Sequence, residues 1–167
     1  MERRPATEEE AKALASPLRL RILRLCLDEA WTNKQLAEHL GKDPATLLHH
    51  VRTLERTGFL AAEPERRGAR GARERPYRAT GKSWGLSLDG DTGNSLAMLD
   101  AFSAELRENL DPVLFTRIAI RLGPEDLDEL RDRMQALVEE FVTRDEPGQP
   151  SYGFLITGHR RSMPDGS

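Results

Sequence analysis

The chain has a single cysteine and no long apolar run, and each shortage excludes a class of protein. Cys26 alone cannot form an internal disulfide, which excludes a disulfide-stapled scaffold. No apolar stretch reaches the roughly eighteen residues that a membrane helix needs, so we expect no membrane partner. Residues 1–5 lead into an acidic run rather than an apolar one, so no secretory signal is visible and we expect a cytoplasmic protein.

Charge is divided unevenly along the 167 residues, of which 38% are hydrophobic and 32% charged. Residues 1–82 hold 17 Lys and Arg against 12 Asp and Glu, a net of +5, whereas residues 83–167 hold 8 against 16, a net of −8. The basic N-terminal half suits a polyanionic partner, and such a partner would repel the acidic C-terminal half. The alternative is that the acidic half simply faces water.

The front half carries repeated helix-start signals, in which a capping side chain is followed by a proline or by a Glu or Gln three residues later. They predict helices that open at Thr7, Ser16, Thr32 and Asp43. Gly41 separates the third helix from the fourth, which ends before Gly58, so the pair reads as a helix-turn-helix.

Two short apolar segments after this helix pair predict a hairpin. Residues 59–63 and 76–79 read as its strands, and the loop between them is rich in Arg and Gly. A helix-turn-helix followed by a hairpin with a basic tip is a winged-helix arrangement, which we assign to residues 1–82.

The fourth helix is amphipathic, with Leu47, Val51 and Leu54 within one arc that must face the core. Small and hydrogen-bonding residues lie elsewhere and could reach base edges in a major groove. The DNA-binding candidates on this helix are Ala45, Thr46, Leu48, His49, Arg52 and Arg56. Taken alone, this face could equally be a solvated helix surface.

The hairpin loop concentrates arginine, which suits phosphate neutralisation and a narrow minor groove. Its DNA-binding candidates are Arg66, Arg67, Arg70, Arg73 and Arg75. The alternative is a basic loop without a function, which the wing position makes the weaker interpretation.

Three segments, residues 14–23, 45–54 and 58–60, resemble the ArsR family of winged-helix repressors in sequence and order. The resemblance covers about residues 10–82 and implies a homodimer that represses at a palindromic operator and is released by a ligand. Leu48 stands where the family commonly has Ser, which weakens base readout there. The helix over 32–40 lacks the Cys-x-Cys pair of the metal sensors, so we expect a non-metal-sensing type without metal or cofactor.

Beyond a linker at residues 85–91, apolar residues recur at helical spacing over 92–110. We expect this helix to pair with a symmetric copy, and the alternative is packing on its own domain. The predicted dimerisation residues are Leu96, Leu99, Phe102, Leu106 and Leu110.

Alternating apolar residues over 114–122 and 152–156 predict two strands that flank a helix from about residue 124. Two strands and a helix cannot bury both faces alone, so the unit packs on the 92–110 helix or completes a sheet with its dimer mate. We expect an α+β protein, with residues 92–160 serving dimerisation and forming a candidate effector region.

The sequence therefore predicts a DNA-binding transcriptional regulator, a repressor acting as a homodimer on double-stranded DNA and open to a small-molecule effector that the residues do not name. A winged helix used for protein–protein interaction is the alternative, which the basic exposed face disfavours. We expect no enzyme, because neither a phosphate-binding loop nor a nucleophile–base pair stands out.

Overall fold

The computed structural model describes residues 4–68, 73–87, 92–108, 114, 116–146 and 148–160. The chain divides into two compact units, Met1–Pro112 and Val113–Ser167. None of the described helices combines the length and the apolar character needed to cross a membrane.

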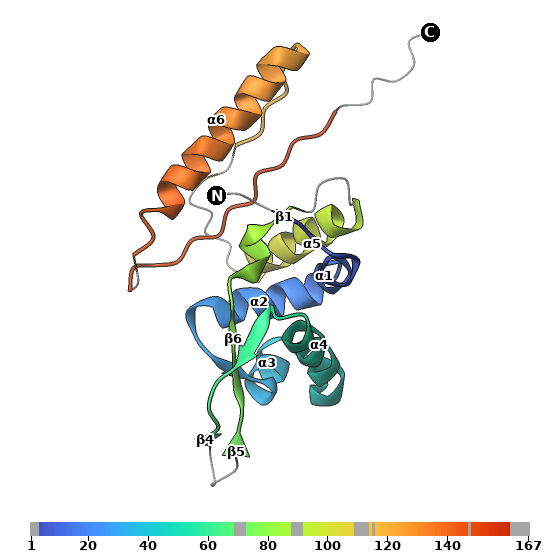
Figure 1. Ribbon diagram of the computed structural model, residues 1–167, viewed down its shortest axis with the longest axis vertical. Helices are drawn as coiled ribbons and strands as arrows, with labels where there is room; N and C mark the ends of the chain where they lie inside the picture. The colour runs from blue at the N-terminus through green and yellow to red at the C-terminus, as the bar shows by residue number, and fades with distance from the viewer. Residues whose placement is uncertain are drawn as a thin grey trace. The chain divides into compact units, whose positions relative to one another are not determined.

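Four capped helices open the first unit (Figure 1), and they confirm the predicted helix starts. The hydroxyl groups of Thr7, Ser16 and Thr32 and the carboxylate of Asp43 each accept a backbone N–H of the first helical turn. The helices are α1 (Glu8–Leu14), α2 (Pro17–Asp28), α3 (Asn33–His39) and α4 (Pro44–Arg56).

The predicted hairpin is present and gains a third strand. The strands β2 (Trp31–Thr32), β6 (Pro76–Ala79) and β3 (Leu60–Ala62) form an antiparallel sheet in the order β2-β6-β3. Beyond β3 and β6 the ribbon continues as β4 (Arg66–Arg67) paired with β5 (Arg73–Glu74). Helix-turn-helix and wing together make the first unit a winged-helix fold, as the sequence predicts.

Part of the predicted linker is structured. The strand β7 (Leu86–Ser87) follows the 3-10 helix η2 (Lys82–Gly85) and pairs in parallel with β1 (Arg4–Pro5). Leu86 is 5% exposed and belongs to the core. Two-residue strands are too short to show an alternating pattern in the sequence.

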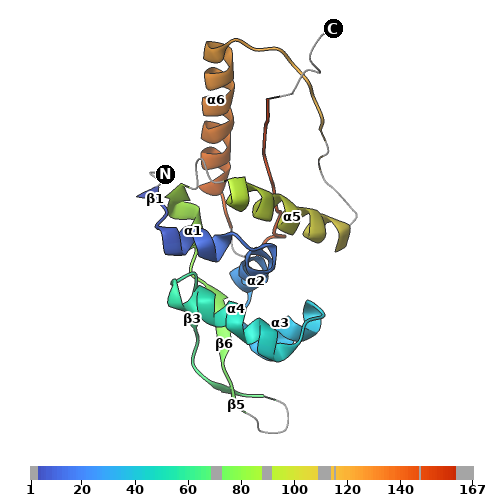
Figure 2. The ribbon, with the colours of Figure 1, turned by 90° about the vertical axis from the view of Figure 1, so that its right-hand side faces the viewer.

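The core lies between the four helices and the sheet, and α5 (Thr92–Glu108) packs on its α2 side. Figure 2 shows α5 across α2 from α3 and the wing. Ala97 and Ala101 are buried and let α5 approach closely, so by contacts α5 belongs with the winged helix rather than with residues 114–160. The fully buried side chains of the core include Leu14, Ile22, Leu36, Leu47, Val51, Leu54 and Phe59.

The second unit contains α6 (Pro124–Val142), which confirms its predicted helix. The prediction of two flanking strands is wrong. Residues 114, 116–122 and 152–156 have no strand structure, and most of their side chains are exposed. Strands need hydrogen-bonded neighbours, and two isolated segments with one helix offer neither a ladder nor a covered face.

Candidate nucleic-acid interface

The turn between α3 and α4 is fixed by local hydrogen bonds. Gly41 takes a φ of +60° in the left-handed region, where glycine avoids the cost of a Cβ. The backbone N–H of Lys42 donates to the Ala37 carbonyl at 2.9 Å. The Asn33 amide donates to the Pro44 carbonyl at 2.9 Å, which joins the starts of the two helices. These bonds set how α4 projects from the domain.

The two faces of α4 are sharply different. Leu47, Val51 and Leu54 are fully buried and anchor one face in the core. On the opposite face every predicted candidate except Leu48 is exposed, and Leu48 is half-buried, which limits its reach toward a base. The exposed candidates are Ala45, Thr46, His49, Arg52 and Arg56.

The two arginines of α4 differ in whether an acidic side chain already contacts them. Arg56 Nε lies 3.2 Å from the Glu9 carboxylate of α1. Arg52 is exposed and has no ion pair or hydrogen bond to another described side chain. Because a phosphate or base must compete with an existing carboxylate partner, Arg52 is the better-placed donor on this helix.

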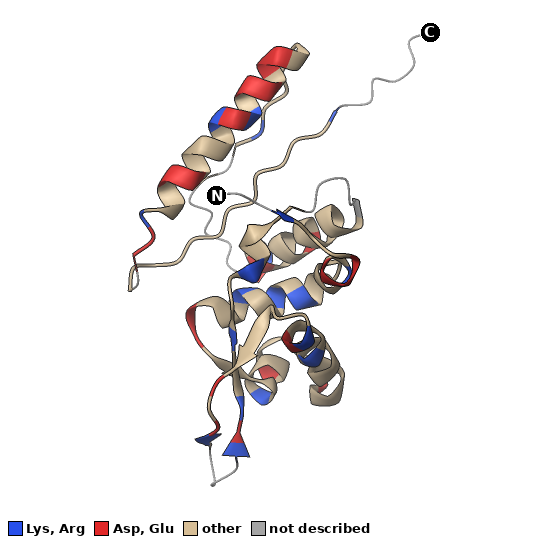
Figure 3. Ribbon diagram, viewed as in Figure 1, with Lys and Arg blue, Asp and Glu red and all other residues tan. Residues whose placement is uncertain are grey.

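The wing brings like charges together. Arg67 lies directly opposite Arg73, and Arg66 opposite Glu74, in the β4–β5 register. Figure 3 shows Lys and Arg colouring at both strands of this tip. Facing arginines repel each other, and an anion between them would relieve that repulsion. Arg70, a predicted site residue, lies outside the described residues.

Several wing arginines are already engaged with acidic or polar neighbours. Arg73 lies 3.6 Å from Glu65, and Arg75 lies 2.8 Å from Glu55 on α4. Arg67 is exposed and, in the part of the chain that is described, has no acidic partner. Among the described arginines that the sequence predicts to bind DNA, Arg67 and Arg52 are therefore the two without an acidic partner.

A contact that the sequence did not single out ties the wing to α3. Arg66 Nη2 donates to the Gln35 side-chain oxygen at 3.3 Å, and that oxygen also accepts the Thr32 backbone N–H. The capping box identified Gln35 as a helix-start residue, but nothing in the sequence placed it beside the wing. The wing, α3 and α4 thus lie on one side of the domain (Figure 2).

His50 and Cys26 are each affected by burial in the first unit. Burial, and then the nearby Arg19 and His49, lower the pKa of His50. Cys26 is buried, and this burial raises the pKa of its thiol to about 12. Among the described residues no group of three His, Cys, Asp or Glu side chains is arranged to hold a metal ion.

The predicted dimerisation residues that are described are more exposed than the buried Ala97 and Ala101 of the same helix. Leu96 is 56% and Leu99 46% exposed, while Phe102 and Leu106 are half-buried. Leu110 lies outside the described residues. The helix therefore packs on its own domain through alanines and leaves a second, apolar face open.

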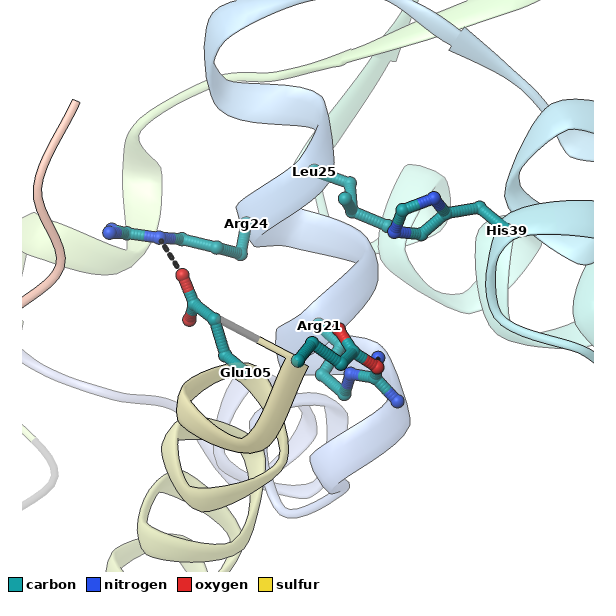
Figure 4. Close-up of a pocket in the computed structure, with 6 residues that line it drawn as sticks. Arg21, Arg24, Leu25, His39 and Glu105 are labelled. Carbon is teal, nitrogen blue, oxygen red and sulfur yellow. Dashed lines mark hydrogen bonds and ion pairs between the residues drawn. The ribbon is translucent and has the colours of Figure 1, made fainter. Parts of the chain in front are cut away.

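A small hollow lies where α5 meets α2 and the end of α3 (Figure 4). Arg24 Nε lies 3.2 Å from the Glu105 carboxylate, and Arg21 pairs with Glu108. Leu25 and His39 complete its lining. Because both guanidinium groups already face carboxylates, these pairs serve to hold α5 on α2.

Comparison with known proteins supports the helix-turn-helix. Residues 14–62 match the family model described as a helix-turn-helix domain. The matched residues run from the end of α1 to the end of β3. That match covers well under half of the chain. No curated protein matches the chain in sequence.

Solved structures with partial similarity include three bacterial proteins. Reduced HlyU from Vibrio cholerae N16961 is 24% identical, with a TM-score of 0.36 over 53% of this chain and 77% of that one. The transcriptional repressor BigR from Xylella fastidiosa is 16% identical, with a TM-score of 0.35 over 63% and 84%. ZitR from Lactococcus lactis, in complex with DNA, is 18% identical, with a TM-score of 0.35 over 75% and 74%. At these scores the likenesses carry no inference about function.

Proposed function

We propose that the protein is a sequence-specific DNA-binding transcriptional regulator, acting as a homodimeric repressor on a palindromic operator in the cytoplasm. The observation that carries this proposal is that Thr46, His49 and Arg52 are exposed on α4, a helix that lies at the same end of the first unit as α3 and the arginine-bearing wing (Figure 2). A helix of this kind fits a major groove, and the wing reaches the adjacent backbone or minor groove.

The chemistry of each part suggests a distinct role. Ala45 and Thr46 are small and allow the start of α4 to approach base edges, where the Thr46 methyl group can contact thymine. Arg52 supplies a donor fork for guanine or phosphate. Arg66 and Arg67 neutralise backbone phosphates, a contribution that is independent of sequence and sensitive to salt.

The open face of α5 supports the proposed homodimer. Exposed leucines at 96 and 99 lie opposite the alanines that contact α2, so a symmetric copy of α5 would cover them. Two recognition helices related by a two-fold axis would read an inverted repeat. A small-molecule effector would act by changing how the two α5 helices meet.

The test is selection of bound fragments from random duplex DNA, followed by a salt titration of the selected site against a scrambled duplex. We expect an inverted repeat bound at least about a thousandfold more tightly than the scrambled control. Weak binding that is blind to sequence would overturn the proposal and favour a winged helix that contacts protein.

A further inference from the structure

The second unit exposes far more apolar surface than a self-contained fold tolerates. No described residue between 114 and 160 is buried, and α6 has no buried residue. Twelve large apolar side chains in the unit are exposed, namely Leu114, Ile118, Ile120, Leu122, Leu127, Leu137, Val138, Phe141, Val142, Tyr152, Phe154 and Ile156.

This surface is large enough for a stable interface. At roughly 100 Å² for each half-exposed large side chain, the exposed apolar area is on the order of 1,000 Å². A standard interface buries about 800 Å² per partner, so the summed area is enough for one. The unit as a single copy is therefore incomplete.

The pattern of the exposed residues indicates what is missing. In residues 116–122 the apolar side chains of Ile118, Ile120 and Leu122 alternate with Arg117 and Arg121. This period of two is that of a strand with one covered and one wetted face. Around Phe154 the large side chains of Tyr152, Phe154 and Ile156 also recur at every second position, with Gly153 and Leu155 between them. Neither segment has a neighbouring strand in the described part of the chain.

A second copy of this chain supplies both missing parts. Two copies provide four strand segments and two α6 helices, enough for a sheet with one face covered by helices and the arginine face in water. Only residues 109–113 separate α5 from Leu114, at most about 18 Å of extended chain. A dimer held at α5 therefore brings two second units together at high effective concentration.

We propose that residues 114–160 form a second interface between two copies of this chain, in which 116–122 and 152–156 become strands of a shared sheet covered by both α6 helices. This inference deepens the proposed homodimer and rests on it. It makes the second unit an assembly element rather than a docking site for a different protein.

The first test is amide hydrogen exchange of the full chain at several protein concentrations. We expect protection of 116–122 and 152–156 that rises with dimer formation and is lost on dilution to monomer. Absence of protection at every concentration would overturn the proposal. Equal protection in the monomer would also overturn it, since the cover would then come from the same chain, for example from α5.

The second test separates this interface from the one at α5. In a Leu99→Glu background, where the α5 face is disrupted, we expect residual self-association by sedimentation equilibrium. Adding Ile120→Glu should weaken that association more than about tenfold. Adding Ala119→Glu, which places the same charge on the opposite strand face, should change it by less than about twofold. Equal effects of the two substitutions would overturn the proposal.

Failure of this interface and failure of the proposed function give different results. Ile120→Glu in the otherwise natural chain should still select the same DNA half-site, because α4 and the wing are unchanged. If the chain binds its operator as a dimer while residues 116–122 stay unprotected, only the shared sheet is wrong. If no DNA sequence is selected but the shared sheet forms, only the proposed DNA-binding function is wrong.

Discussion

The ammonium group of Lys82 lies 2.8 Å from the carboxylate of Glu10 and also donates to the Thr57 carbonyl oxygen at 2.6 Å. Thr57 is the C-cap of α4, so this lysine joins α1 to the C-terminal end of α4. The Glu10 side chain is 8% exposed and also binds Arg4 at 2.6 Å. The hydrogen bonds from Arg4, from Lys82 and from the Thr7 backbone hold the pKa of Glu10 well below its ordinary value.

Replacing Lys82 with methionine should lower the free energy of unfolding by about 1–3 kcal/mol, because Glu10 and the Thr57 carbonyl each lose a donor while partly buried. Urea unfolding at pH 7 measures the change. Lys42→Met is the matched control, since Lys42 is exposed and makes no ion pair within the described part of the chain. Indistinguishable midpoints for the two variants would show that Lys82 does not hold α4 in place.

Stability should depend on pH through Glu10. Its pKa is lowered in the folded chain and returns toward the ordinary 4.5 on unfolding. The unfolded chain therefore takes up the proton first as the pH falls, so the contribution of Glu10 is complete above about pH 5 and is lost below it. We expect Glu10→Gln to be less stable than the natural chain at pH 7, with the gap narrowing toward pH 3.

Unfolding free energies at a series of pH values test this expectation. Glu38→Gln, an exposed substitution on α3, should leave the difference from the natural chain constant over the same range. A gap for Glu10→Gln that stays constant or widens on acidification would contradict the ion-pair explanation.

The winged helix was predictable because its signals are local. The capping box at Thr32 and the Asp43-Pro44 start are short-range hydrogen-bond patterns, and the buried stripe of α4 follows from helical spacing alone. These features place the exposed face of α4 correctly, including Arg52.

The state of the wing arginines was not predictable, because it depends on contacts between distant residues. Arg75 is neutralised by Glu55, twenty positions earlier in the chain, and nothing in the local sequence pairs them. The predicted strands at 114–122 and 152–156 failed for a related reason. Alternation indicates a capacity to form a strand, but a strand also needs a neighbour, and the single chain supplies none.

Arg52→Ala should lower affinity for the selected operator by about 1–3 kcal/mol if the guanidinium group reads a base, and should relax preference at one position of each half-site. Binding titrations against the operator and its single-base variants measure both effects. The control is Arg107→Ala, which removes the same charge at an exposed position of α5, a helix that lies across α2 from α3 and the wing (Figure 2). Unchanged operator binding by Arg52→Ala would remove this residue from the interface.

Replacing both Arg66 and Arg67 with alanine should weaken binding to specific and scrambled duplexes alike. Loss of two phosphate contacts per chain should reduce the slope of log affinity against log salt by about 1.8 for each wing. We expect Arg67 to account for more of the loss than Arg66, which already contacts Gln35 and Glu74. A salt slope equal to that of the natural chain would show that the wing does not touch the backbone.

Leu99→Glu should raise the dimer dissociation constant by more than about tenfold, because the carboxylate would be buried without a partner where two α5 helices meet. Sedimentation equilibrium of the full chain measures the constant. Arg107→Gln changes the net charge by the same amount on the same helix and should leave the constant within about twofold. The winged helix should remain folded in both variants, since Leu99 is 46% exposed in the single chain. A Leu99→Glu variant that dimerises as tightly as Arg107→Gln would move the dimer contact away from α5.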